Sequence, residues 1–184
     1  TYSANGARAF DHDIVGRKMF RTPIAVTSGS LDDVPEPNEA AVGLGRHLDG
    51  CRIGFDLGGS DRKCAALIDG EVVHSEEVVW NPYFESDPKY HWDGINDTIR
   101  RAAEKLPRVD AIGGSSAGDY ANNEVLVASL FRGVSEEDFE EHVRRIFWRV
   151  QKEWNDVPFV VANDGEVTAL AGSMSMKANA VLGV

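Results

Sequence analysis

The feature that most constrains the fold is a change in the order of the expected elements near residue 81. Three strand-like segments come first, and they are residues 52–59, 62–69 and 71–80. Apolar runs and partial alternation mark them as strands, and Asp69-Gly70 is a hairpin-turn dipeptide between the second and the third. Because tight hairpins join antiparallel strands, this part of the chain predicts an antiparallel three-stranded unit.

Strands and helices alternate after this unit. The expected segments are a helix at 93–106, a strand within 108–118, a helix at 135–154, a strand at 157–162 and a helix at 165–176. The helix at 135–154 has the clearest pattern, because Phe139, Val143 and Phe147 repeat at helical spacing after a capping signal at Ser135. The order β-β-β-α-β-α-β-α predicts an α/β fold, a mixed sheet with helices on both faces.

The first 50 residues show no such periodicity. An acidic, proline-containing connector there predicts an N-terminal arm or extra element over 1–50, and 51–184 form the predicted sheet domain. The sequence starts at Thr1 without a methionine and stops in the apolar run NAVLGV. We therefore expect it to be a piece of a longer protein.

Composition limits the classes of partner. The 184 residues are 42% hydrophobic and 27% charged, as in an ordinary soluble globular protein. A net charge of -11 and a pI of about 4.8 argue against nucleic acid or an anionic membrane as partner. No apolar run approaches the roughly 20 residues of a membrane span. Cys51 and Cys64 show no zinc or redox spacing, and His74, His91 and His142 show no metal-ligand spacing, so we expect a cytoplasmic location and no metal site among them.

Three loops follow predicted strands, at 58–63, 113–118 and 163–164. Ligands of α/β sheets gather at the carboxyl ends of the parallel strands. We therefore expect the loops to converge on one edge of the sheet and to bind a small molecule there. The sequence is compatible with a homodimer but does not determine the oligomeric state.

The first loop has the composition of a phosphate-binding turn. Gly58 and Gly59 allow unusual backbone conformations in which successive amides turn toward one anion. Ser60 adds a hydroxyl, Lys63 adds a charge, and Asp56 at the end of the strand can hold Mg²⁺ through water. The alternative is a glycine hairpin turn without a ligand, and the spacing is not that of a P-loop.

The third loop places Asn163 and Asp164 between a buried strand and a helix. A carboxylate there can accept a proton from a substrate hydroxyl, and the amide of Asn163 can orient a polyol. The alternative for Asp164 is a helix cap.

The middle loop, GSSAG, matches a nucleophile elbow with Ser116 as nucleophile, which would make the protein a serine hydrolase. The match is incomplete, because no helix is expected directly after it and the only later histidine, His142, lies within a predicted helix. The preferred interpretation is a floor of small residues, Ser116, Ala117 and Gly118, that lets a ligand approach the backbone. Trp92, in the loop before the first predicted helix, is either a core residue or a platform for a sugar.

The motifs IGFDLGGSDRKCAALIDG, VDAIGGSSAG and VPFVVANDGEVTALAG, taken in this order, resemble the actin-like ATPase superfamily. Within it they are most similar to the ROK family of repressors and sugar kinases. The resemblance covers the sequence from about residue 52 to the end and implies a ribonuclease H-like domain. It implies that ATP phosphates and Mg²⁺ are bound by Asp56, Gly58, Gly59, Ser60 and Lys63. It also places Asn163 and Asp164 at the sugar substrate, with Asp164 as the catalytic base.

The sequence departs from the family pattern at two places. Asp61 and Arg62 lie inside the phosphate turn, and Gly165-Glu166 replaces the small residues usual after the catalytic aspartate. The family's second phosphate motif, adenosine motif and histidine–cysteine zinc site are expected beyond Val184, so the resemblance implies an N-terminal lobe that is inactive alone.

The expected function is therefore that of the first lobe of an ATP-dependent sugar kinase. Three alternatives remain: a non-catalytic sugar sensor on the same fold, a serine hydrolase acting through Ser116, and an ATPase that drives conformational change.

Overall fold

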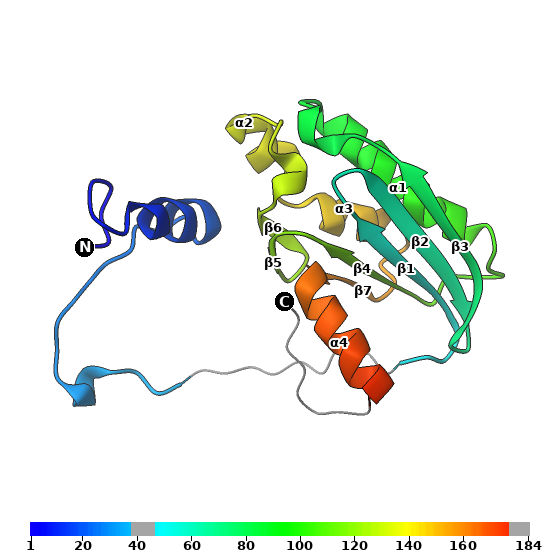
Figure 1. The fold of residues 1–184 in the computed structure, drawn as a ribbon, viewed down its shortest axis with the longest axis horizontal. Helices are drawn as coiled ribbons and strands as arrows, with labels where there is room; N and C mark the ends of the chain where they lie inside the picture. The colour runs from blue at the N-terminus through cyan, green and yellow to red at the C-terminus, as the bar shows by residue number, and fades with distance from the viewer. Residues whose placement is uncertain (38–46, 177–184) are drawn as a thin grey trace. The chain divides into compact units, whose positions relative to one another are not determined.

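The computed structural model describes residues 1–37 and 47–176 and divides the chain into two compact units, Thr1–Gly45 and Arg46–Val184 (Figure 1). The first unit contains a short helix with π-type hydrogen bonds, η1 (Asp11–Met19), and a 3₁₀ turn, η2 (Leu31–Asp33). Gly16 is the buried residue of η1, where an added Cβ would lie 3.0 Å from the Thr22 carbonyl oxygen. The second unit contains all the predicted site residues.

The centre of the second unit is a five-stranded mixed sheet with the strand order β3-β2-β1-β4-β7. Its strands are β1 (Cys51–Leu57), β2 (Asp61–Ile68), β3 (Glu71–Val79), β4 (Ala111–Ser116) and β7 (Phe159–Asn163). The β1–β2 and β2–β3 pairs are antiparallel, whereas β1–β4 and β4–β7 are parallel. The predicted mixed sheet and its α/β class are thus confirmed.

Helices cover both faces of this sheet, as predicted (Figure 1). On one face, α1 (Pro88–Ala103) packs on β1 and β2 and also contacts α3 (Ile146–Glu153). On the other, α4 (Asp164–Met176) contacts β4 and β7. None of the helices in residues 1–37 and 47–176 combines the length and the hydropathy that a membrane span needs.

The helix predicted at 93–106 begins earlier than expected, at Pro88. The side chain of Asp87 accepts a hydrogen bond from the Lys89 amide, and proline is suited to the first helical position because its missing N–H needs no partner there. Pro88 was interpreted as a loop residue, so this boundary was wrong.

The helix predicted at 135–154 is interrupted. It consists of α2 (Glu136–Asp138), the π-type segment η5 (Phe139–Val143) and α3, with a break at Arg144 and Arg145. The carbonyl of Arg144 accepts a hydrogen bond from the Val125 amide at 2.9 Å. The amide of Val125, from a distant strand, thus donates to a carbonyl that in a continuous helix would accept a hydrogen bond from the next turn.

That strand belongs to a small hairpin of β5 (Asp119–Ala121) and β6 (Glu124–Val127), expected only as a turn and an apolar segment. Its turn residues Asn122 and Asn123 have φ of 50° and 63°, a region that asparagine tolerates. The Asn123 side chain also bonds the edge of β7, donating to the Phe159 carbonyl and accepting from the Val161 amide.

Aromatic rings fill the core under α3. The rings of Phe55, Phe147 and Phe159 have centroids 6.0 to 6.3 Å apart. A Cβ added to Gly114 on β4 would lie 2.0 Å from the ring of Phe55. The first glycine of GSSAG therefore makes room for the core rather than for a ligand. The described part of this unit, residues 47–176, also contains the 3₁₀ turns η3 (Pro82–Phe84) and η4 (Ser129–Phe131).

Candidate functional site

The carboxyl ends of β1, β4 and β7 lie side by side at one edge of the sheet. The strand register puts Leu57 beside Ser116 and Ser116 beside Asn163. One row of the sheet therefore carries the last residue of each strand, and the three predicted loops begin from this row. Their approach to one another follows from the parallel register, as the sequence predicted.

Asp56 lies one position earlier, beside Ser115. The Ser115 hydroxyl donates a 2.6 Å hydrogen bond to Oδ1 of Asp56, and Ser115 itself is buried. A fixed hydroxyl donor orients this half-buried carboxylate toward the end of the strand. Sequence reasoning selected Ser116 and missed Ser115; the parallel pairing of two residues far apart in the chain identifies it.

Ser116 is almost fully buried, and its hydroxyl donates to the Leu57 carbonyl at 2.9 Å. The strand after GSSAG is β5, so no helix follows the serine as a nucleophile elbow requires. His142 lies in η5 and lines a hollow that contains none of the three loops. The geometry contradicts the serine hydrolase alternative, because Ser116 acts as a link between β4 and β1.

The rest of the middle loop is a backbone turn. Gly118 has a φ of 146°, which side chains disfavour, and its carbonyl accepts a 2.8 Å hydrogen bond from Nδ2 of Asn163. Ala117 is exposed beside it. The middle and third loops are thus directly bonded to each other.

Asn163 occupies the cap position of α4. Its Oδ1 accepts a 2.8 Å hydrogen bond from the Gly165 amide, so the side chain joins the helix start to Gly118. Asp164 is the first residue of α4 and is exposed, with its own Oδ1 3.0 Å from the Gly165 amide. The cap position belongs to Asn163, which leaves most of the carboxylate of Asp164 facing outward.

Tyr120 is a member of this site that sequence reasoning missed. Its hydroxyl lies 3.4 Å from the Ala117 carbonyl. Burial is the main cause that raises the pKa of Tyr120 to about 12; a hydrogen bond with Ser116 opposes this shift, and the charge of Asp164 adds to it. The phenol therefore stays neutral near Asp164. No sequence pattern marks it, since it lies in a hairpin that was not expected.

The first loop is a tight turn held by Trp80. The Gly58 amide donates to the Asp61 carbonyl at 2.9 Å, while the Trp80 indole N–H donates to the Gly58 carbonyl at 2.8 Å. Neither Gly58 nor Gly59 has a positive φ, in contrast to the expectation. Glycine is needed for space instead, because a Cβ on Gly59 would lie 2.3 Å from the Tyr83 ring.

Two of the predicted phosphate ligands are bonded to Asp61. Ser60 Oγ donates to its Oδ2 at 3.0 Å, and Lys63 Nζ donates to its Oδ1. The hydrogen bond from Lys63 lowers the pKa of Asp61, and the same contact raises the pKa of Lys63. The carboxylate of Asp61 thus bonds the Ser60 hydroxyl and the Lys63 ammonium, the side-chain groups that were expected to bind phosphate.

Arg62, which follows Asp61 and also departs from the family pattern, contacts α1 instead of the turn. Its guanidinium donates to Gly94 and Thr98 of α1 and forms an ion pair with Asp97 at 2.6 Å. It fastens β2 to α1 and takes no part in the turn.

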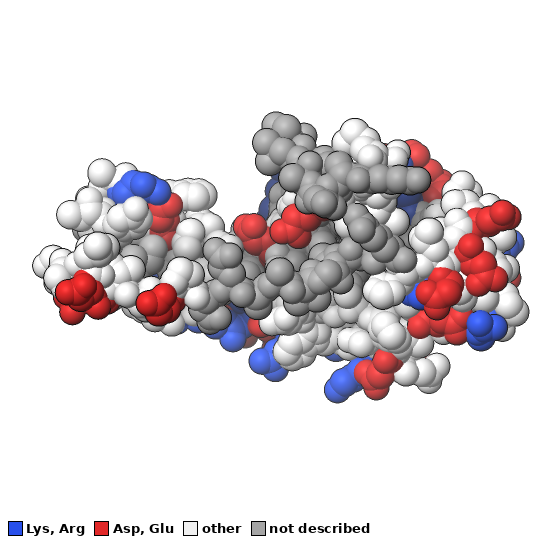
Figure 2. Space-filling model, turned by 90° about the horizontal axis from the view of Figure 1, so that it is seen from below, with Lys and Arg blue, Asp and Glu red and all other residues white. Residues whose placement is uncertain are grey.

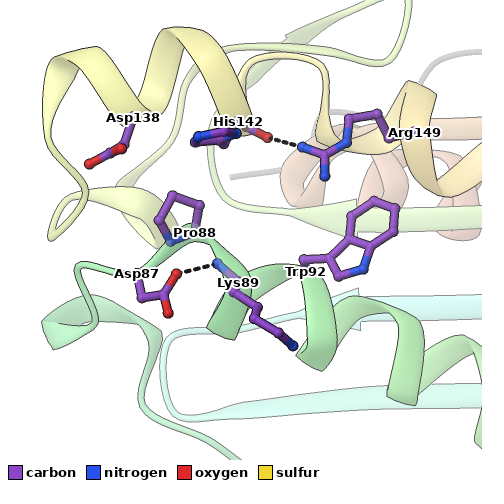
Figure 3. Close-up of a pocket in the computed structure, with 7 residues that line it drawn as sticks. All are labelled: Asp87, Pro88, Lys89, Trp92, Asp138, His142 and Arg149. Atoms are coloured by element: carbon purple, nitrogen blue, oxygen red, sulfur yellow. Dashed lines mark hydrogen bonds between the residues drawn. The ribbon is translucent and has the colours of Figure 1, made fainter.

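Trp92 lies in a separate hollow of about 290 Å³ between α1 and the α2–α3 segment (Figure 3). The guanidinium of Arg149 lies 4.7 Å from the centre of its indole ring. The lining residues are Asp87, Pro88, Lys89, Trp92, Asp138, His142 and Arg149, and none belongs to the three loops. The structure therefore does not bring Trp92 into the candidate site.

On the face shown in Figure 2, acidic and basic side chains of the described residues are interspersed without a continuous basic patch.

Solved structures share the fold of this chain. A glucokinase from Parabacteroides distasonis has a TM-score of 0.53 at 16% identity, over 70% of this chain and 35% of the kinase chain. A ROK-family transcriptional regulator, a homolog of the E. coli MLC protein, has a TM-score of 0.52 at 20% identity, over 69% of this chain and 31% of its own. The chain shares a part of the fold of this ROK-family protein and of the glucokinase.

The Lmo2764 protein from Listeria monocytogenes, assigned as an N-acetylmannosamine kinase, has a TM-score of 0.50 at 16% identity, over 67% of this chain and 38% of its own. The chain thus spans about a third of the length of these proteins. No family model matches the sequence, and no curated protein matches it. The resemblance drawn from the three motifs is confirmed at the level of the ROK fold, which kinases and a regulator share.

Proposed function

We propose that this chain is the N-terminal lobe of an ATP-dependent sugar kinase that transfers a phosphoryl group from Mg-ATP to a sugar hydroxyl. The observation that supports it most is the meeting of Asp56, Asn163 and Asp164 at the carboxyl ends of adjacent parallel strands. An acid suited to a metal lies there on β1 and an acid suited to proton transfer at the start of α4, directly after β7, with Ser115 and Ser116 of β4 between these two strands.

The phosphate side consists of β1 and the turn after it. The carboxylate of Asp56, oriented by Ser115, fits a site for water-bound Mg²⁺, since such sites combine one or two carboxylates with phosphate oxygens. Gly58, Gly59, Ser60 and Lys63 would face the phosphates. Bound Mg-ATP supplies the phosphoryl group, and the residues of the chain contribute positioning and charge.

The sugar side consists of the middle and third loops. Asp164 accepts the proton of the attacking hydroxyl, because its carboxylate is exposed at the start of α4. Asn163 keeps one N–H and one lone pair beyond its bonds to Gly118 and Gly165, enough to orient a second hydroxyl. Ser116, Ala117 and Gly118 form the floor, beside the neutral phenol of Tyr120.

The chain alone is expected to be inactive, because a second lobe must close on this edge to complete the site and exclude water. The test therefore uses the full-length protein, Mg-ATP and a panel of hexoses and amino sugars, with ADP release as readout. Asp164→Asn is compared with Asp156→Asn, a change of the same kind at an exposed acid outside the site.

Sugar-dependent ADP release that falls at least about 100-fold in Asp164→Asn and persists in Asp156→Asn is the expected result. ADP release that no sugar stimulates would contradict the proposal and indicate an ATPase that drives conformational change. Equal activity in both variants would remove Asp164 from the role of base.

A second candidate, a sugar-binding sensor without catalysis, is favoured by one observation. Asp61 holds Ser60 and Lys63 through its own carboxylate, which competes with a phosphate for the same donors. In that case a sugar raises the melting temperature of the full-length protein while no ADP appears.

A further inference from the structure

Cys64, His74 and Glu76 face one another on β2 and β3, and Cys64 directly follows the first loop. Cys64 pairs with Glu76 across the two strands, and His74 pairs with Ala66, two residues further along the same face. The thiol sulfur, an imidazole nitrogen and a carboxylate oxygen all lie within 4.8 Å of one another. A thiol, an imidazole and a carboxylate are the three side-chain groups that bind zinc in proteins.

The imidazole of His74 has an unused nitrogen in this cluster. Its Nε2 is buried and makes no hydrogen bond to the described residues, and Oε2 of Glu76 lies 3.5 Å away. That separation is too long for a good hydrogen bond. Two ligand atoms about 2.0 Å from one tetrahedral zinc lie about 3.3 Å apart, so this pair is spaced for a shared ion.

Glu76 is held in this orientation by a second partner. Arg101 of α1 donates to Oε1 of Glu76 at 2.7 Å and, through its Nε, to Asp97 at 2.8 Å. Oε1 is thus occupied by the guanidinium while Oε2 faces His74. Carboxylate ligands of metals are commonly fixed by such an outer hydrogen bond.

We propose that Cys64, His74 and Glu76 form a binding site for a divalent ion of the zinc type, with water as the fourth ligand. Thiolate and imidazole select zinc or cobalt over Mg²⁺ and Ca²⁺, which prefer oxygen ligands. Cys64 and the Nε2 atom of His74 are buried, but the side chains of His74 and Glu76 are 25% and 34% exposed, so the cluster lies at the margin of the core, close to solvent. The Cys64 thiol releases its proton to solvent when the metal–sulfur bond forms.

This site is independent of the proposed kinase function and differs from the zinc site that the family resemblance implies beyond Val184. It would fasten β2 to β3 at the middle of their ladder, three residues from Asp61 at the start of β2. The 184-residue chain is the right material for the test, because it contains this cluster without the second expected site.

The test is titration of the reduced chain with Co²⁺, followed by absorption spectroscopy. A sulfur-to-cobalt charge-transfer band and tetrahedral visible bands are expected at one equivalent, and Zn²⁺ should abolish both. The bands should disappear in Cys64→Ser and persist in Cys51→Ser, which alters the other buried free cysteine. Arg101→Gln should weaken Co²⁺ binding by about 10- to 100-fold, since it leaves the ligands in place but frees the carboxylate.

Because Cys64→Ser alters a core residue, His74→Asn and Glu76→Gln provide variants at partly exposed positions, each expected to lose tetrahedral binding. The melting temperature should rise with Zn²⁺ in the wild type and in Cys51→Ser but not in His74→Asn. The proposal is overturned if the wild type shows no charge-transfer band with excess Co²⁺, or if the band survives in Cys64→Ser.

Discussion

Replacing Gly114 by alanine tests whether the middle loop is built for the core or for a ligand. The new methyl group would lie 2.0 Å from the Phe55 ring, a distance that no side chain accepts, so the ring must move. Phe55 is buried and contacts both Phe147 and Phe159. The displacement therefore spreads to all three rings.

The free energy of unfolding should fall by about 2–4 kcal/mol. Overpacking of a core costs about 1–3 kcal/mol, and each aromatic pair that is disturbed loses a part of its roughly 0.5–1.5 kcal/mol. For a chain of this size, this loss lowers the melting temperature by about 4–16 °C, at about 2–4 °C for each kcal/mol.

Urea unfolding of the 184-residue chain measures the effect, with Gly113→Ala as the matched control. A Cβ on Gly113 meets no atom of the described residues within 4 Å, so this neighbouring change on the other face of β4 should be close to neutral. Adding Phe55→Leu to Gly114→Ala should recover part of the loss. Equal stability of the two glycine variants would refute the packing argument and return Gly114 to a role in ligand binding.

Two further predictions concern charged groups. Asp61→Asn should tighten binding of Mg-ATP to the full-length protein, because it frees Lys63 from its hydrogen bond. The control Glu77→Gln removes a charge that lies 4.0 Å from Lys63 without a hydrogen bond, and it should have a smaller effect. Isothermal titration calorimetry measures both affinities, and weaker binding in Asp61→Asn would contradict this prediction. Partial burial raises the pKa of Asp97, but hydrogen bonds from Arg101 and Arg62 more than offset it and hold the pKa below the ordinary range of an aspartate. The ion pairs of Asp97 therefore stabilise the fold above about pH 4, and this stabilisation disappears as the pH falls through the lowered pKa. The urea midpoints of the wild type and of Asp97→Asn should converge in acid. A difference between the two midpoints that stays constant with pH would contradict the role given to these ion pairs.

The succession of the five sheet strands along the chain was predictable because its signals are local. The Asp69-Gly70 turn has φ of 51° and 85°, the values that its dipeptide favours, and the apolar runs around it set the three antiparallel strands. The approach of Asp56 and Asn163 followed from the same order, since parallel strands end at one edge.

What the sequence could not reveal depends on partners far along the chain. The helix at 135–154 is interrupted because Val125 bonds Arg144, and no periodicity within the helix records that contact. Likewise, Cys64 and His74 share no ligand spacing, and only the β2–β3 register, with its irregularity after Ala66, brings them together. Ser115 and Tyr120 escaped notice for the same reason.

The hydrogen bond from Ser115 to Asp56 joins residues 59 positions apart, and this has a consequence for the order of folding. The β1–β2–β3 meander closes short loops and can form early, whereas the pairing of β1 with β4 must first close a long one. The turn at 58–63 belongs to the meander, but the meeting of Asp56 with Ser115, Asn163 and Asp164 lies on the late side of that division. We therefore expect a nascent or partly unfolded chain to contain the meander, and with it Cys64, His74 and Glu76, before Asp56 and Asp164 share an edge.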